Sequence, residues 1–229
     1  MVTMLSANSR GSQMLSRFRF AEELSPSAKS AVDSELLSFA AEGRTLLIQK
    51  GDTVGGVYLV YEGALRVYSM NANGRESTLY WIEPGESCIL AMNCVFSNIL
   101  YPAWVESGRL GAKFAVIPSH VYRRIHESER AVQQFTFDVL SARIFDLMST
   151  LEDATTLPLD RRLANFVLKK SGADMRLPMS HEEIASHLGT AREVVSRNLR
   201  GLEEAGLVRV ARGHTEIVSV EGLRSYIYA

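Results

Sequence analysis

Short hydrophobic runs alternate with polar turns through the first half of the chain, and this pattern predicts β-structure. The runs are rich in β-branched and aromatic residues, which favour strands, and glycine, asparagine or proline separates them. The predicted strands cover residues 46–48, 57–61, 64–68, 77–82 and 112–117. Many short strands with closely spaced turns are typical of a jelly roll or barrel.

The residues before these strands carry weaker patterns. The first 20 residues predict no more than a short helix near 14–20. Ser25-Pro26 and the periodic segment 31–40 predict a second helix before the main fold. We therefore assign residues 1–34 to an N-terminal tail with helices and residues 35–126 to the barrel.

A long helix with two apolar stripes is predicted next, within residues 127–152. One stripe repeats at the 3, 4, 3, 4 spacing of a coiled coil, and a second stripe lies beside it. Two stripes need two surfaces, so one can pack on the barrel and the other on a partner, which favours a parallel homodimer. The expected dimer-interface residues are Val132, Phe135, Phe137, Leu140, Ile144, Leu147 and Leu151.

The last part of the chain, residues 153–229, has the pattern of a winged helix-turn-helix. Residues 153–156 with Pro158 predict a hinge, and residues 159–170 predict a first helix. Ser180 and Thr190 are each followed three residues later by glutamate, which is capping-box spacing at two helix starts. A hairpin is predicted from residues 207–210 and 215–220, with a basic tip between them.

The second of these two helices has one apolar and one polar face. Val195, Leu199 and Leu202 form the apolar stripe. Arginine can donate two hydrogen bonds to guanine and glutamate can accept one from cytosine, so the polar face suits DNA; a solvated face with ordinary i,i+4 pairs is the alternative. The candidate DNA-binding residues, including two at the hairpin tip, are Ser180, Thr190, Arg192, Glu193, Ser196, Arg197, Arg200, Arg212 and His214.

Residues 180–220 resemble the DNA-binding domain of the cyclic-AMP receptor protein / FNR (Crp/Fnr) superfamily of bacterial transcription regulators, through the run at 192–197. The resemblance implies that Arg192, Glu193 and Arg197 read base edges. Ser196 matches the FNR branch and Arg192 the cyclic-AMP branch, so neither branch's half-site can be assigned. Gly51, Gly63, Gly74 and Gly85 resemble the cyclic-nucleotide-binding barrel, which extends the resemblance to about residues 35–225.

The expected effector pocket departs from the family at one point. Gly85-Glu86 and Ala103-Trp104 match the family's phosphate-binding motif, but Tyr101-Pro102 stand where the family has Arg-Ser/Thr. Tyrosine brings no charge and proline no N–H, and the 19 residues from 87 to 105 hold no Lys, Arg or His. A buried phosphate needs such partners, so we expect that cyclic AMP does not bind in the family's usual way.

Another signal could use this pocket, whose candidate residues are Gly85, Glu86, Cys88, Met92, Cys94, Tyr101, Ala103 and Trp104. The two cysteines could sense oxidants or, with Met92, bind haem or another metal; alternatively they pack as small hydrophobic side chains. A disulfide between them would need a loop, and an iron–sulfur cluster needs four cysteines. The five histidines show no metal-ligand spacing, so no metal site is assigned and no cofactor is required.

Composition and charge narrow the class of protein. With 46% hydrophobic and 22% charged residues the chain is globular. Residues 155–229 carry 11 Lys+Arg against 9 Asp+Glu and residues 1–154 carry 14 against 17, which suits a site-specific DNA binder with a local basic patch. The N-terminus lacks a signal-peptide core and the uncharged segment 87–105 is too polar for a membrane span, so we expect a cytoplasmic protein without membrane contact.

The sequence therefore predicts an α+β protein: a cyclic-nucleotide-binding-like jelly-roll barrel, a long dimerisation helix and a winged helix-turn-helix. We expect a homodimeric transcription regulator that binds pseudo-palindromic double-stranded DNA, contacts RNA polymerase and answers to a signal other than cyclic AMP. Two alternatives stay open, a ligand-binding regulatory subunit for a protein partner and a DNA binder that needs no ligand. No catalytic arrangement is found, so an enzyme is not expected.

Overall fold

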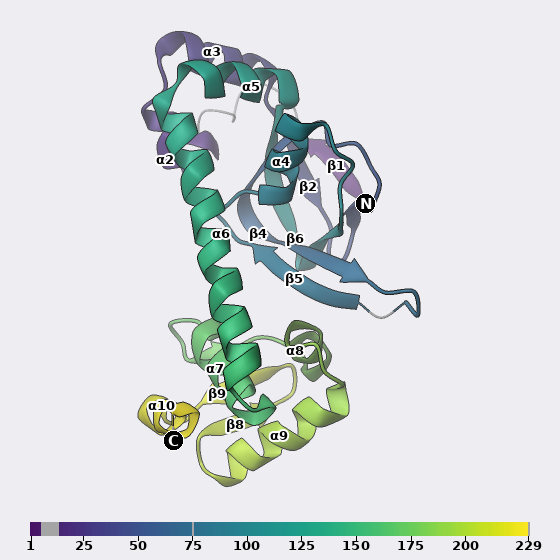
Figure 1. Ribbon diagram of the computed structural model, residues 1–229, viewed down its shortest axis with the longest axis vertical. Helices are drawn as coiled ribbons and strands as arrows, with labels where there is room; N and C mark the ends of the chain where they lie inside the picture. The colour runs from purple at the N-terminus through teal and green to yellow at the C-terminus, as the bar shows by residue number, and fades with distance from the viewer. Residues whose placement is uncertain (6–13, 75, 229) are drawn as a thin grey trace. The chain divides into compact units, whose positions relative to one another are not determined.

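The computed structural model describes residues 1–5, 14–74 and 76–228, which form two compact units, Met1–Ile144 and Phe145–Ala229 (Figure 1). The first unit is built on an antiparallel sheet in the order β1-β2-β6-β4-β5, and β3 also pairs with β6. Its strands are β1 (Val2–Leu5), β2 (Leu37–Ala41), β3 (Leu46–Ile48), β4 (Gly56–Met70), β5 (Glu76–Ile82) and β6 (Trp104–Pro118). Its shorter helices are α2 (Arg19–Glu22), α3 (Pro26–Glu35), α4 (Ile89–Ser97) and α5 (Ser119–Ser128).

All five predicted segments, 46–48, 57–61, 64–68, 77–82 and 112–117, lie in strands, but the expected turn between 57–61 and 64–68 and the expected extent of the helix at 31–40 are wrong. Residues 57–61 and 64–68 belong to one long strand, β4, because Gly63 bends the chain at φ 71° without ending the ladder. A side chain at Gly63 would clash with the carbonyl oxygen of Gly111 on β6, so only glycine fits. The helix predicted over 31–40 ends at Glu35, since residues 37–41 pair with β6 as β2.

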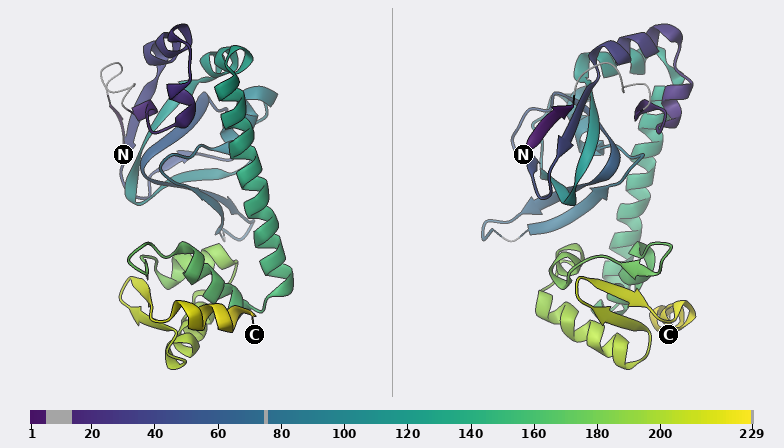
Figure 2. Two further views of the ribbon diagram at one scale, coloured as in Figure 1. Left: turned by 90° about the vertical axis from the view of Figure 1, so that its left-hand side faces the viewer. Right: turned by 180° about the vertical axis from the view of Figure 1, so that it is seen from behind.

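The N-terminal residues also join the fold. Val2–Leu5 form the edge strand β1 against β2, although the sequence shows no strand pattern there. The short helix expected near 14–20 is interrupted: residues 14–15 are helical, a turn follows, and α2 then runs from Arg19 to Glu22. At one end of the sheet, α3 and α5 lie side by side (Figures 1 and 2).

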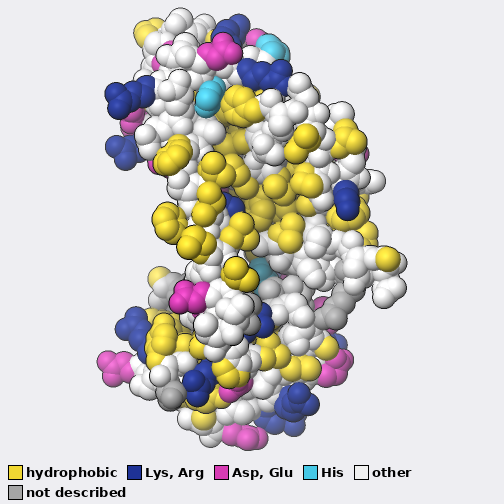
Figure 3. Space-filling view, viewed as in Figure 1, with side chains coloured by type: hydrophobic (Ala, Val, Ile, Leu, Met, Phe, Trp, Pro, Cys, Tyr) yellow, Lys and Arg dark blue, Asp and Glu magenta, His cyan; other side chains and the backbone are white. Residues whose placement is uncertain are grey.

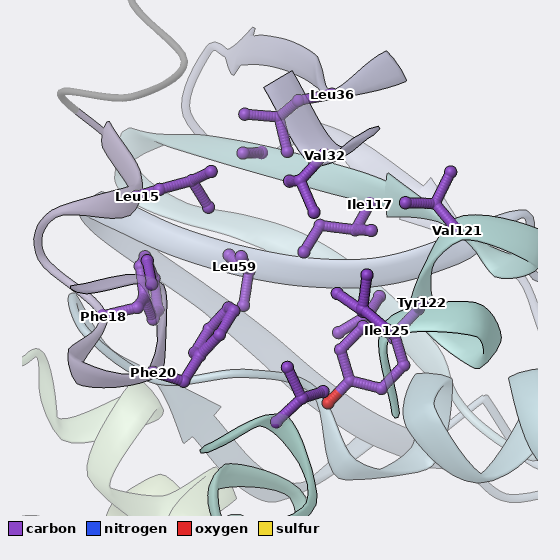
Figure 4. Close-up of a cluster of buried hydrophobic side chains, with 14 of the residues drawn as sticks. Leu15, Phe18, Phe20, Val32, Leu36, Leu59, Ile117, Val121, Tyr122 and Ile125 are labelled. Carbon is purple, nitrogen blue, oxygen red and sulfur yellow. The ribbon is translucent and has the colours of Figure 1, made fainter. Parts of the chain in front are cut away.

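Beneath these helices lies a hydrophobic cluster that includes Leu15, Phe18, Val32, Ile117 and Ile125 (Figure 4). A second cluster fills the barrel. The first cluster also takes in the start of α6 (Arg130–Thr156), and this corrects the dimer prediction. Val132 is fully buried, so it cannot face a partner, and the half-buried Phe135 packs on its own subunit with its ring 4.6 Å from the ring of Phe20.

The hinge predicted at 153–156 is also wrong, because α6 continues to Thr156. The hydroxyls of Thr155 and Thr156 donate hydrogen bonds to backbone carbonyls of the preceding turn. The helix ends just before Leu157, since the proline at 158 disfavours a helical conformation in the residue that precedes it.

In the second unit, helices α7, α8, α9 and α10 and a small sheet pack around one core. Helix α7 (Leu159–Lys170) has the bounds that the sequence predicts. The hairpin is also confirmed, although its second strand ends at Ile217 because α10 begins at Val220. The remaining elements are β7 (Arg176–Leu177), α8 (His181–Leu188), α9 (Arg192–Glu204), β8 (Val208–Ala211), β9 (His214–Ile217) and α10 (Val220–Tyr228). Within the described ranges, no helix combines the length and apolar character that a membrane crossing requires.

Candidate nucleic-acid interface

Helices α8 and α9 form a helix-turn-helix whose start and turn are locally determined. The Ser180 hydroxyl accepts a hydrogen bond from the backbone N–H of Glu183, and the Glu183 carboxylate accepts one from the backbone N–H of Ser180 at 2.7 Å. This reciprocal pair confirms the first predicted capping box. Gly189 ends α8 in the left-handed conformation at φ 66°, which glycine adopts without a Cβ clash.

The second predicted capping box, at Thr190, is wrong. Helix α9 begins after Ala191, which caps it without any side-chain hydrogen bond. The backbone N–H of Thr190 instead bonds to the carbonyl of Ala185 at 3.0 Å, so Thr190 closes the end of α8. The spacing to Glu193 is therefore accidental.

The two faces of α9 are separated as the sequence predicts. Val195, Leu199 and Leu202 are buried at 1% exposure or less and pack in one core with Ile184 of α8. The structure brings the predicted polar side chains of α9 together on the opposite face. Ser196 is half-buried there, and the exposed members are Arg192, Glu193, Arg197 and Arg200. Such a face offers base edges both donors and acceptors.

The hairpin β8–β9 presents its own charges. Arg212 at the tip is exposed and His214 is half-buried. On the central strand β9, Glu216 accepts a hydrogen bond from Arg176 at 2.6 Å and lies 3.4 Å from Arg209. The hydrogen bond from Arg176 lowers the pKa of Glu216. Glu216 thus balances the charges of Arg176 and Arg209 on the strands, whereas Arg212 lies beyond them at the exposed tip.

The unit's outer helices are tied by polar contacts. The Tyr226 hydroxyl of α10 donates to Asp160 of α7 at 2.6 Å, and this bond lowers the pKa of Asp160. Asn165, buried on α7, donates to Asp153 at 2.7 Å, and Lys169 pairs with the same carboxylate at 3.2 Å. These contacts fix the helices on which the helix-turn-helix core rests.

In the barrel, the structure brings together some of the predicted pocket residues. The Cys88 thiol caps α4 and lies 3.2 Å from the hydroxyl of Tyr101 and 3.7 Å from that of Tyr80. Burial raises the pKa of both tyrosines, so their hydroxyls stay protonated. Ala103 is buried beside Tyr101, whereas Trp104 is half-buried.

Other predicted pocket residues lie elsewhere. Met92 is buried in the cluster beneath α3 and α5, whereas Cys88 and Cys94 belong to the cluster that fills the barrel, so Met92 does not share their cluster. Gly85 and Glu86 are exposed. Cys94 is a free, buried thiol whose pKa is raised by burial, which lowers its reactivity. Among the described residues there is no group of three or more His, Cys, Asp or Glu that could hold a metal ion.

Sequence reasoning missed Arg143 of α6. Its guanidinium lies 4.2 Å from the centre of the Tyr80 ring and 3.8 Å from the Glu86 carboxylate, with its side chain only 15% exposed. Residues 87–105 contain no cationic side chain, so the positive charge near the predicted pocket is supplied by Arg143 from α6. The available signal was its spacing: Arg143 follows Val139 by four positions on the barrel-facing side of the helix.

Each of the two units matches a known protein family. Residues 161–226 match the Crp-like helix-turn-helix domain, and residues 37–107 match the cyclic nucleotide-binding domain. The chain belongs to the Crp/Fnr superfamily. It is accordingly a DNA-binding transcription regulator, as its curated Crp/Fnr relatives are, and not an enzyme.

The relatives span most of the chain. The transcriptional activator protein FnrA of Stutzerimonas stutzeri is 27% identical over 194 residues, which are 80% of this chain and 76% of FnrA. The nitrogen fixation regulation protein FixK of Rhizobium meliloti is 26% identical over 213 residues, 89% and 92% of the two chains. A solved Crp/Fnr-family structure from Eubacterium rectale is 28% identical with TM-score 0.79, covering 93% of this chain and all of that one (100%).

The capping geometry of this Crp/Fnr chain yields a matched pair of substitutions. Ser180→Ala should reduce the stability of α8 by about 1 kcal/mol, because the backbone N–H of Glu183 loses its acceptor. Thr190→Ala should change stability by less than about 0.5 kcal/mol, since that hydroxyl does not cap α9. Native-state hydrogen exchange of the α8 and α9 amides measures both effects. An equal loss in the two variants would contradict the assignment of Ala191 as the cap.

Proposed function

We propose that the chain is a homodimeric transcription regulator that binds pseudo-palindromic DNA through α9 and is controlled through its barrel by a signal other than cyclic AMP. The observation that carries DNA reading is the exposed Arg192, Glu193, Arg197 and Arg200 on a helix whose opposite face is fully buried. The N-terminal part of such a helix enters the major groove in helix-turn-helix proteins. Ser180 and the hairpin residues Arg212 and His214 are proposed to contact phosphates.

The dimer is proposed from the unburied stripe of α6. Phe137, Leu140, Ile144, Leu147 and Leu151 are 42–65% exposed, and hydrophobic side chains gather along α6 in Figure 3. Monomers rarely expose so much contiguous apolar surface, and the coiled-coil spacing suits a second copy of the same helix. A two-fold dimer would place two α9 helices on half-sites about one DNA turn apart.

The proposed mechanism is a population shift: a signal in the barrel or at α6 favours one placement of the two reading helices. Thiol chemistry at Cys88, haem and a small apolar ligand stay open as signals, as does DNA binding without a ligand. Contact with RNA polymerase and a cytoplasmic location are proposed as consequences of acting on transcription.

DNA reading is tested by Arg197→Ala. This change should cost about 1–3 kcal/mol of affinity for the selected site and relax the preference at one base pair, because a base-edge donor is lost. The matched control is Arg224→Ala, an exposed arginine on α10, which should leave affinity nearly unchanged. Fluorescence anisotropy with a site selected from random DNA gives both values. Equal affinities for the two variants would favour the alternative of a regulatory subunit for a protein partner.

The dimer is tested by charge on α6. Leu140→Glu should convert the dimer to a monomer at micromolar concentration, because two carboxylates would be buried in the interface. Ala142→Glu, exposed on the opposite side of the helix, should leave the dimer intact. Light scattering coupled to gel filtration distinguishes the two masses. A wild-type monomer, or dimers in both variants, would contradict the proposed interface.

The choice of signal is tested by titration with cyclic nucleotides. Pro102 offers no N–H, Tyr101 is held by Cys88, and Glu86 accepts from the backbone N–H of Glu83 at 2.9 Å. Calorimetry with cyclic AMP or cyclic GMP should therefore show no micromolar binding in a preparation that binds DNA. Micromolar affinity for either nucleotide would overturn the assignment.

A further inference from the structure

A hydrogen bond joins the two helices of the helix-turn-helix on its reading side. His181, the first residue of α8, places its Nδ1 2.8 Å from the hydroxyl oxygen of Ser196 on α9. Both side chains are half-buried, and Ser196 is the half-buried member of the polar face. The hydroxyl that faces DNA is therefore already engaged on one side by an imidazole.

The chemistry of the two groups makes this contact directional. A serine hydroxyl has one hydrogen to donate and two lone pairs to accept with. When the imidazole is neutral with Nδ1 unprotonated, Ser196 donates its only hydrogen to His181 and can offer DNA lone pairs alone. When the imidazole is protonated, Nδ1 donates to Ser196, and the serine hydrogen becomes available to a base.

The surroundings favour the neutral imidazole. Burial, and then the positive charge of Arg192 on α9, lower the pKa of His181 below its ordinary value. On its own helix the neighbouring carboxylates are Glu182, which is exposed, and Glu183, which is held by Ser180. Near pH 7 the imidazole is therefore uncharged, and it gains its proton only in acid.

We propose that His181 is a positioning residue that sets the direction of the Ser196 hydrogen bond to DNA. With His181 neutral and unprotonated at Nδ1, Ser196 donates to the imidazole and accepts from an amino group, and so favours adenine or cytosine at the base it faces. With protonated His181, Ser196 donates, and the preference moves toward the guanine or thymine oxygens. This inference rests on the proposed entry of α9 into the major groove.

The test is selection of binding sites from random DNA at about pH 8 and about pH 5.5, with full-length wild type and three variants. The wild type should change its ratio of adenine or cytosine to guanine or thymine at one base pair by about fivefold, the ratio that one hydrogen bond supplies. His181→Asn keeps a hydrogen-bonding side chain that does not titrate, so its preference should not depend on pH. Ser196→Ala should lose both the discrimination and its pH dependence at that base pair, and His181→Ala should relax the discrimination.

Each failure has a different meaning. If the wild type selects no DNA sequence at pH 8, the proposed function itself fails. If it selects one but the preference is the same at both pH values, or shifts equally in His181→Asn, the role of His181 is overturned. A gain in acid that is uniform across sequences would show only attraction of the imidazolium to phosphate, and would also overturn it.

A second measurement needs no variant. Nitrogen-15 NMR of histidine-labelled protein should show an unprotonated Nδ1 on His181 at about pH 8, since Ser196 is proposed to donate to it. A proton on Nδ1 at that pH would reverse the direction of the bond and overturn the inference even if α9 reads DNA.

Discussion

Burial of one stripe of α9 is the constraint on which the proposed DNA-reading face of this helix depends. Val195, Leu199 and Leu202 recur at helical spacing and are enclosed by the core of the second unit. Rotating the helix by one residue step would bring arginine or glutamate into that core, and an unpaired buried charge costs several kcal/mol. The packing of three apolar side chains thus keeps the charged ones in solvent. No separate device is needed to orient Arg192, Glu193 and Arg197.

Local signals explain what the sequence could predict. Helix α7 was placed correctly because Pro158 sets its start and apolar residues repeat along it. The Ser180 capping box is also local, since both partners lie within four residues. Thr190 has the same spacing and failed because the turn made by Gly189 commits its backbone to the end of α8. The same capping-box spacing thus forms a cap at Ser180 but not at Thr190, because a helix and a tight turn come directly before Thr190.

The other errors arose where the deciding partner lies far away in sequence. Residues 37–41 could continue a helix by pattern, yet β6 supplies their hydrogen bonds from more than 70 positions later. On α6 both stripes are equally apolar, and only the rings of Phe18 and Phe20 show that Phe135 belongs to the subunit's own core. Hydrophobic pattern states that a face will be covered but does not state by what.

Arg143 illustrates the same limit in the barrel and gives α6 a role there. In the family, the arginine that binds the phosphate stands at the position of Tyr101, which is a buried tyrosine in this chain. The cation arrives instead from α6, and its charge is met by Glu86 and the Tyr80 ring. An anionic ligand would have to compete with Glu86 for this guanidinium. Tyr80 contacts both Cys88 and Arg143. A modification of the Cys88 thiol could therefore affect α6 through this one side chain. In the proposed mechanism, a signal shifts the population of the two α9 placements only if it binds them unequally, and the contact between Tyr80 and Arg143 is where such a difference can arise.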